Sequence, residues 1–200
     1  MKELNIRELK ADEFEAAAHL LGRGMRDNPN NLQAFGQDRA HRERALARMF
    51  LPVLRRTHAK GKVFGAFDRG KMVGVYAITA PGQCQLNGCD KLRIVPAIFL
   101  GNPLTTPLRV LRWVGEWSWR DPSEPHWHLG PVAVDAQLQG QGIGGAMMAD
   151  FCARMGECGA LSYLETDKSE NVRFYQKFGF SVIAEAEILG VPNWFMSRPS

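Results

Sequence analysis

The sequence has little cysteine, no long apolar run and no strong excess of one charge. Its four cysteines are too few for a disulfide scaffold in a chain of 200 residues, so all four are expected to be thiols in a reducing environment. No apolar window approaches the roughly 18 residues that span a bilayer, and Met1–Asn5 lacks the hydrophobic centre of a signal peptide. We therefore expect a cytoplasmic protein that is not inserted into a membrane.

The charges nearly balance and are spread along the chain. Lys and Arg number 25 against 21 Asp and Glu, a net charge of +4, and they do not gather in runs. Proteins that follow a nucleic-acid backbone concentrate basic residues on one surface, so nucleic acid is not an expected partner. With 45% hydrophobic residues, no repeat and no low-complexity linker, residues 1–200 are expected to form a single domain.

Apolar spacing predicts a chain in which strands and helices alternate. The expected strands are Leu4–Leu9, Val63–Phe67, Met72–Thr79, His126–Val134, Leu161–Thr166, Phe180–Ile188 and Asn193–Ser197. Helices are expected after Asp12, over Arg39–Arg56, after Thr106, from Ile143 to Met155 and over Asn171–Phe178. Pro52 is expected to kink or split the second helix, residues 26–38 to form turns, and residues 80–103 show no clear pattern.

The order of these elements predicts the fold class. Asp68–Lys71 suits a tight antiparallel hairpin, whereas the strand, helix and strand around residues 126–166 require a right-handed parallel unit. We expect an α+β domain with a mixed, mostly antiparallel, six- to seven-stranded sheet and helices on both faces.

A glycine-rich turn is the most informative stretch of the chain. The strand Val132-Ala133-Val134 is followed by Gln139-Gly140-Gln141-Gly142-Ile143-Gly144-Gly145 and then by an apolar helical pattern. Glycine lets backbone N–H groups crowd around an anion, and the positive end of the following helix dipole points at the same place. The turn therefore predicts a ligand that carries phosphates.

One interpretation of this turn is a dinucleotide site. Gly140, Gly142 and Gly145 have the spacing of the dinucleotide fingerprint, and Glu165 ends the next strand, where a ribose-binding acid is expected. However, five residues separate Val134 from Gly140, and only 35 residues follow Glu165. That is too short for the remaining strands and crossovers of a dinucleotide fold, so this interpretation is the weaker one.

The same residues in another frame resemble a different family. Gln139, Gly142 and Gly144 after the strand at residues 126–135 resemble the acyl-CoA-binding signature of the GNAT superfamily of N-acetyltransferases. Downstream, the family's conserved positions are matched by Asn171, Tyr175, Gly179 and Phe180. The resemblance is specific across about residues 126–180 and is limited to the order of elements before them.

The resemblance implies an acetyl-CoA-dependent enzyme that acetylates an amine directly, without a covalent acyl-enzyme. Tyr175 would be the general acid for the leaving thiolate, and Asn171 would hold the pantetheine arm. Backbone groups of a splayed strand would pair with pantetheine, and the turn would bind the pyrophosphate. These cofactor-binding positions are Val132, Ala133, Val134, Gln139, Gly140, Gln141, Gly142, Ile143, Gly144 and Gly145. Gly130-Pro131 supports the splay, because proline cannot donate a ladder hydrogen bond.

The general base is open among Glu124, His126 and His128, which lie at or along that strand. Histidine has an ordinary pKa near 6.5, which suits a base at neutral pH, and each residue could instead be structural. Tyr76 and Thr79 are expected to line the acceptor pocket. The acceptor amine itself is not encoded in a recognisable pattern, since the loops that would define it, near residues 24–38 and 80–105, carry none.

The remaining features point to no metal. Cys84 and Cys89 could join His126 and His128 around zinc, but their spacing is not that of a common zinc site. Cys152 fits an apolar helical spacing and is expected in the core. Alternatives to an enzyme are a non-catalytic acyl-CoA sensor and, less favoured, the dinucleotide-binding protein; a homodimer is left open.

Overall fold

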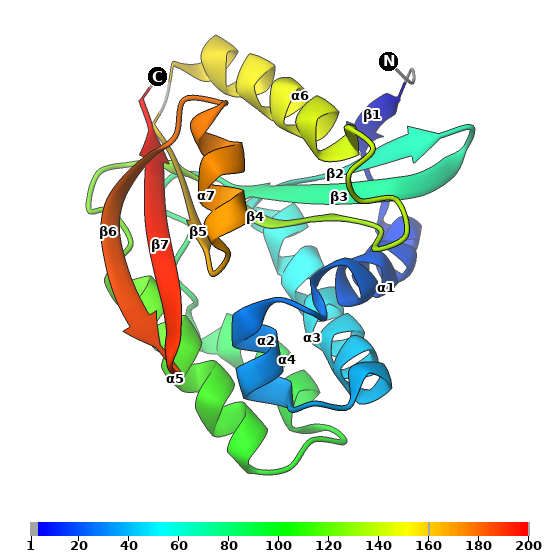
Figure 1. The fold of residues 1–200 in the computed structure, drawn as a ribbon, viewed down its shortest axis with the longest axis vertical. Helices are drawn as coiled ribbons and strands as arrows, with labels where there is room; N and C mark the ends of the chain where they lie inside the picture. Colours follow the sequence, from blue (N-terminus) through cyan, green and yellow to red (C-terminus); the bar gives the residue numbers. More distant parts are fainter. Residues whose placement is uncertain (1–3, 160, 200) are drawn as a thin grey trace.

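The computed structural model describes residues 4–159 and 161–199 and shows one sheet between two layers of helices (Figure 1). The sheet has seven strands in the order β1-β2-β3-β4-β5-β7-β6. The strands are β1 (Asn5–Glu8), β2 (Gly61–Asp68), β3 (Lys71–Thr79), β4 (Trp127–Val134), β5 (Ser162–Thr166), β6 (Ser181–Ile188) and β7 (Val191–Arg198). Only β4 and β5 pair in parallel among these strands, so the predicted mixed, mostly antiparallel sheet is confirmed.

The helices include two that the sequence patterns did not predict. They are α1 (Phe14–Met25), α2 (Pro29–Phe35), α3 (Arg39–Lys60), α4 (Gly88–Phe99), α5 (Thr105–Trp119), α6 (Ile143–Cys158) and α7 (Ser169–Gln176), after a short 3₁₀ turn at Ala11–Glu13. The unpredicted α2 begins with proline at its first position, and α4 begins with a reciprocal cap in which the Asp90 N–H donates to Asn87 at 2.8 Å. Both are short helices with local start signals.

The expected split at Pro52 is wrong, because α3 is continuous from Arg39 to Lys60. Proline removes one intrahelical hydrogen bond. Buried residues on both sides of it, Phe50 and Leu54, pack into the core that α3 shares with α1. This tertiary packing keeps the helix intact through the proline.

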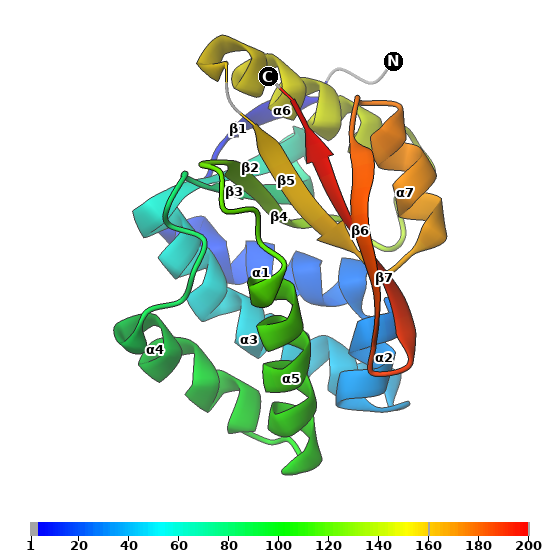
Figure 2. The same ribbon diagram turned by 90° about the vertical axis from the view of Figure 1, so that its left-hand side faces the viewer.

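Two hydrophobic cores lie on opposite faces of the sheet. One core includes Leu21 of α1 and Leu46 of α3, and the other includes Met147 and Phe151 of α6. Figures 1 and 2 show α6 and α7 on the opposite side of the sheet from α1 and α3. Central strands are therefore covered on both faces, and the site lies where this cover opens.

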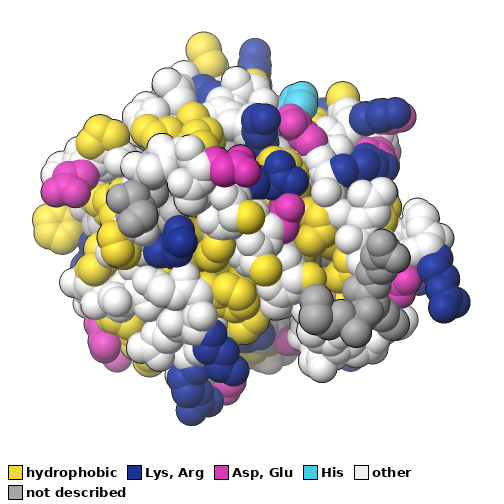
Figure 3. Space-filling view, turned by 90° about the horizontal axis from the view of Figure 1, so that it is seen from above, with side chains coloured by type: hydrophobic (Ala, Val, Ile, Leu, Met, Phe, Trp, Pro, Cys, Tyr) yellow, Lys and Arg dark blue, Asp and Glu magenta, His cyan; other side chains and the backbone are white. Residues whose placement is uncertain are grey.

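The surface is mixed in charge. Figure 3 shows the face that carries α6, where Lys and Arg side chains lie among Asp and Glu and among apolar patches. Within residues 4–159 and 161–199, no helix has the length and apolar character needed to cross a bilayer.

Candidate active site

The parallel strands β4 and β5 stay together for only two residue pairs. Trp127 is opposite Ser162 and His128 is opposite Tyr163, and β4 then continues to Val134 without a described β5 partner. Figure 1 shows β4 following β3 while β5 turns along β7, so the sheet opens between them. Most of β4 is partly exposed, although it is a central strand. We call the region where β4 has no β5 partner the slot, and Val132, Ala133 and Val134 lie on the part of β4 that borders it.

The irregularity predicted at Gly130-Pro131 is present. Val132 is opposite Tyr76 of β3 and Leu129 is opposite Ile78, so two residues of β4 face one residue of β3. Such a bulge bends the strand and ends regular pairing locally. It begins two residues after His128, the last residue of β4 that pairs with β5, so the strand bends close to the point where the two strands part.

The glycine turn joins β4 to α6 at the end of this slot. Gly140 and Gly142 have φ values of 78° and 82°, in the left-handed region that glycine adopts without strain, and Gly142 is the N-cap of α6. A Cβ at Gly140, Gly142 or Gly145 would meet nothing of the chain within 4 Å, so the turn presents open backbone. These glycines are placed where a phosphate would meet amides at a helix N-terminus.

Other residues of the turn hold its shape. The Gln139 side chain donates to the carbonyl oxygens of Gly24 and Val134, both at 3.2 Å, and Asp135 pairs with Arg23 at 2.7 Å. Ile143 is buried in the core against α6, so only its backbone is available to a ligand. Gln141 completes the turn, and a Cβ on Gly144 would lie 3.5 Å from Phe174 of α7.

Helix α7 brings Asn171 and Tyr175 to the β5 side of the slot. The Asn171 amide donates to the Thr166 hydroxyl at 3.0 Å, which fixes it at the end of β5. Tyr175 is only 8% exposed, and burial together with the charge of Asp167 raises the pKa of its phenol. The hydroxyl therefore stays protonated at neutral pH, which suits a proton donor.

Two of the three predicted base candidates lie together in a cluster before the slot. The His128 Nε2 is 2.8 Å from the Glu165 carboxylate, and His126 Nε2 is 3.6 Å from the Cys84 sulfur and 3.5 Å from Asp121. Burial alone would lower both histidine pKa values. The Asp121 carboxylate and Cys84 instead raise the pKa of His126 to about 10, and the charge of Glu165 raises that of His128 well above 6.5. Both rings therefore hold a proton at neutral pH.

Several residues that were expected at the site lie away from the slot. The side chain of Glu124 is exposed, and it is the Glu124 carbonyl that accepts a hydrogen bond from His126 Nδ1 at 2.8 Å. Tyr76 is wrongly predicted as a pocket residue, since it is buried under α6 with its hydroxyl donating to Asp150. Thr79 is also buried, at the register position opposite His128.

Glu165 does not bind a ribose, because its carboxylate is buried against His128. This contact removes the acid that the dinucleotide interpretation requires. Cys152 packs beside the α6 core, as expected.

Asp167 was not predicted as a site residue, yet it directly follows β5 and its charge acts on Tyr175. It follows β5, is 7% exposed, and accepts a hydrogen bond from the Asn30 N–H of α2 at 2.8 Å. Burial raises the pKa of Asp167 against the opposing effect of that hydrogen bond. An acid directly after a buried strand was the available signal, but α2 was not expected beside it.

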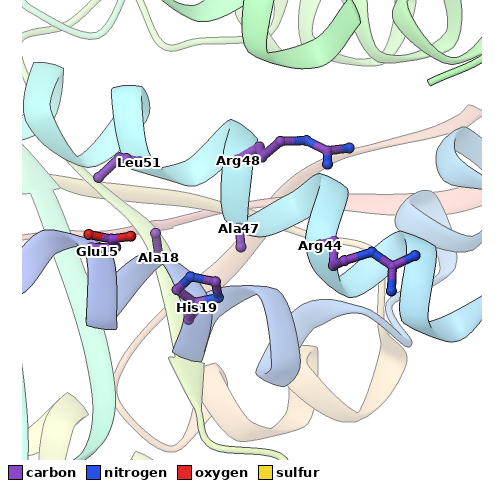
Figure 4. Close-up of a pocket in the computed structure, with 7 residues that line it drawn as sticks. All are labelled: Glu15, Ala18, His19, Arg44, Ala47, Arg48 and Leu51. Atoms are coloured by element: carbon purple, nitrogen blue, oxygen red, sulfur yellow. The ribbon is translucent and has the colours of Figure 1, made fainter. Parts of the chain in front are cut away.

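The described surface also has a cavity of about 280 Å³ between α1 and α3 (Figure 4). It is lined by Glu15, Ala18, His19, Arg44, Ala47, Arg48 and Leu51. None of these is a predicted site residue, and the cavity is separate from the slot.

A sheet that opens beside a glycine turn is suited to hold an acyl carrier along one of its own strands, and the chain is an acyltransferase. More narrowly, residues 30–180 match the acetyltransferase (GNAT) family, and the chain belongs to that family.

Solved structures share the fold along nearly the whole chain. A protein from Corynebacterium glutamicum described as a histone acetyltransferase and related acetyltransferase is 19% identical, with a TM-score of 0.71 and coverage of 98% of this chain and 97% of that one. A GNAT family acetyltransferase from Brucella melitensis in complex with acetyl-CoA is 16% identical, with a TM-score of 0.55 over 100% and 89%. The PaiA N-acetyltransferase from Thermoplasma acidophilum in complex with coenzyme A is 12% identical, with a TM-score of 0.61 over 99% of both chains.

Proposed function

We propose that the protein is an N-acetyltransferase that transfers the acetyl group of acetyl-CoA directly to an amine acceptor in a ternary complex. The observation that carries the proposal is the slot between β4 and β5, which has the glycine turn at one end and Tyr175 at its side. Acetyl-CoA has the two parts that such a slot would bind, an extended pantetheine arm with amide groups and a pyrophosphate.

Each part of acetyl-CoA has a matching surface. Backbone groups of Val132, Ala133 and Val134 that point away from β3 would pair with the pantetheine amides, as an added strand would. The pyrophosphate would lie against the amides of residues 139–145 at the N-terminus of α6. The thioester would then reach the bulge at Gly130-Pro131, beside Tyr175.

The transfer needs two proton movements. The amine nitrogen attacks the thioester carbonyl carbon, a C–N bond forms, the C–S bond breaks, and CoA leaves as a thiolate. Tyr175 would donate its hydroxyl proton to that sulfur, and the amine would lose one proton. Holding both reactants in one slot supplies proximity without a covalent acyl-enzyme.

Asp167 is the group we assign to removing the amine proton, directly or through water. His126 and His128 are already protonated at neutral pH, so neither has a free lone pair there. Asp167 is a buried carboxylate whose pKa is raised, which brings its basicity closer to neutral pH. Its charge acts on Tyr175, and the backbone N–H of Asn30 fixes its orientation.

Asp167→Asn is expected to lower kcat/KM by about 100-fold or more, the usual contribution of a general base. The wild-type rate should fall as the pH drops through the raised pKa of Asp167. Burial raises this pKa, and the positive charge of the neighbouring Lys168 acts in the opposite direction. The variant should lose this acid limb, because asparagine keeps the acceptor for the Asn30 N–H but cannot take a proton. Glu170→Gln, at an exposed acid in the first turn of α7, should keep the wild-type profile. An unchanged acid limb in Asp167→Asn would remove Asp167 from the mechanism.

Acetyl-CoA at saturating concentration is expected to raise the melting temperature, whereas NAD(P) is not. With a panel of small amines, amino acids, aminoglycosides and peptide N-termini, at least one acceptor should release thiol from acetyl-CoA. Binding without thiol release from any acceptor would favour the sensor alternative. The absence of a thermal shift with acetyl-CoA and with longer acyl-CoAs would overturn the proposal.

A further inference from the structure

Four metal-binding side chains from three separate segments meet next to the slot. Cys84 lies in the loop after β3, Asp121 lies in the loop after α5, and His126 and His128 lie before and on β4. One side-chain atom each from Cys84, Asp121 and His128 lie within 4.8 Å of one another. His126 Nε2 lies 3.6 Å from the Cys84 sulfur and 3.5 Å from Asp121 Oδ1.

These separations suit a tetrahedral ion. Zn²⁺ with bonds of about 2.0–2.3 Å holds neighbouring ligand atoms about 3.3–3.8 Å apart. The two His126 distances fall within that range. The atoms of Cys84, Asp121 and His128 lie within 4.8 Å of one another, and on binding they would move closer by about 1 Å or more through side-chain rotation. A thiolate and a carboxylate would also balance the two positive charges of the ion. Because imidazole binds a metal through a deprotonated nitrogen, Zn²⁺ would displace the protons that the two histidine rings hold in its absence.

Each ligand is held from behind, as metal ligands usually are. His126 Nδ1 bonds to the Glu124 carbonyl, which leaves Nε2 facing the cluster. Asp121 Oδ2 accepts from Gln85 at 2.8 Å, while Asp121 Oδ1 is buried without a hydrogen-bond partner. The nearest polar group given for Oδ1 is His126 Nε2 at 3.5 Å, which is beyond the usual hydrogen-bond range, so this buried oxygen faces the cluster without a short contact.

Two further contacts stiffen the site. His128 is backed by Glu165 at 2.8 Å, and the rings of both histidines pack against Tyr163 with centroid distances of 5.2 and 5.6 Å. Arg56 donates to the Cys84 carbonyl at 3.1 Å and so fixes the loop that carries the thiol.

We propose that Cys84, Asp121 and His128, with His126 closing the fourth position, form a binding site for Zn²⁺ that is separate from the acyl-CoA slot. The site would tie the loops after β3 and α5 to β4 just before the sheet opens. Cys89, which the sequence pattern paired with Cys84, is exposed and is not among the clustered residues; Asp121 replaces it.

The test uses the full chain after treatment with a chelator and a thiol reductant. Zn²⁺ should bind with one equivalent, as measured by competition with a chromophoric chelator, and should raise the melting temperature. Co²⁺ in its place should give the thiolate-to-cobalt charge-transfer absorption and the visible bands of a tetrahedral thiolate site. Cys84→Ser should abolish the charge-transfer absorption and weaken Zn²⁺ binding by about 100-fold or more.

Cys89→Ser is the matched control, because it removes an exposed thiol five residues along the same segment, and it should leave binding and spectrum unchanged. His128→Ala, checked for folding by circular dichroism, should also weaken binding while keeping the thiolate absorption at saturating Co²⁺. The proposal is overturned if Zn²⁺ binds Cys84→Ser as tightly as the wild type, if no stoichiometric binding is found, or if Cys89→Ser removes the absorption. These readouts do not depend on acetyl transfer, so they stand apart from the proposed function.

Discussion

Gly142→Val is expected to weaken acetyl-CoA binding by at least about 100-fold, because the substitution acts on backbone that should touch phosphate. Gly142 has φ of 82° as the N-cap of α6, a conformation that costs a β-branched residue about 1–2 kcal/mol. The new side chain would also fill the open space in front of the turn, where a Cβ now meets nothing of the chain within 4 Å. Isothermal titration calorimetry with acetyl-CoA measures the loss directly.

Gly156→Ala is the control on the same helix. Gly156 lies in the last turn of α6, at the opposite end of the helix from the glycine turn, and a Cβ there would meet nothing within 4 Å. Alanine should raise the free energy of unfolding by up to about 1 kcal/mol through helix propensity and leave acetyl-CoA binding unchanged. If circular dichroism shows that Gly142→Val misfolds, Gly142→Ala is the variant to use, because its smaller side chain occupies the same space in front of the turn. Wild-type affinity in a folded Gly142 variant would remove the turn from the acyl-CoA site.

Local patterns in the sequence predict most of the fold. Local spacing of apolar and turn residues is enough to predict the seven strands, the hairpin at Asp68–Lys71 and the parallel unit around the glycine turn. The two unpredicted helices, α2 and α4, lie in stretches whose Gly, Pro and Asn residues indicate turns, and α4 also contains Pro96. The continuity of α3 through Pro52 depends on packing against α1, which no local pattern reports.

The candidate site likewise has residues that local patterns predict and residues that only tertiary contacts bring together. The turn glycines form one short motif before α6, and Asn171 and Tyr175 form a second one on α7, so local spacing is enough to find both. The position of the Asp167 carboxylate depends on its hydrogen bond with α2, and Cys84 contacts His126, which is 42 residues away in the sequence. Both contacts are tertiary, so no local pattern could identify Asp167 or Cys84 as site residues. Side chains alternate along β3, so that Tyr76 and Ile78 lie in the core under α6 and Val75 and Ala77 lie in the other core. The sequence does not say which of these faces α6 covers, and Tyr76 was misplaced for that reason.

Tyr175→Phe is expected to lower kcat by about 100-fold while leaving acetyl-CoA affinity within about twofold of the wild type. Phenylalanine keeps the packing of the buried ring against Phe174 and Phe180 and removes only the proton donor. Since burial and Asp167 raise the Tyr175 pKa, the wild-type hydroxyl should stay protonated through the alkaline range in which enzymes are assayed. Steady-state kinetics with calorimetry separates the two effects.

The chain supplies its own control in Tyr76→Phe. Tyr76 is also a buried tyrosine, but its hydroxyl donates to Asp150, which keeps its two contacts with Arg154 at 2.9 and 3.0 Å when that donor is lost. The Tyr76 variant should therefore lose about 1 kcal/mol of stability and keep its kcat. Tyr175 is proposed to protonate the leaving thiolate, whereas the Tyr76 hydroxyl donates to Asp150 of α6, so only the Tyr175 substitution should lower turnover. Equal kcat losses in both variants would show that Tyr175 acts through packing, and full turnover in Tyr175→Phe would exclude it as the acid.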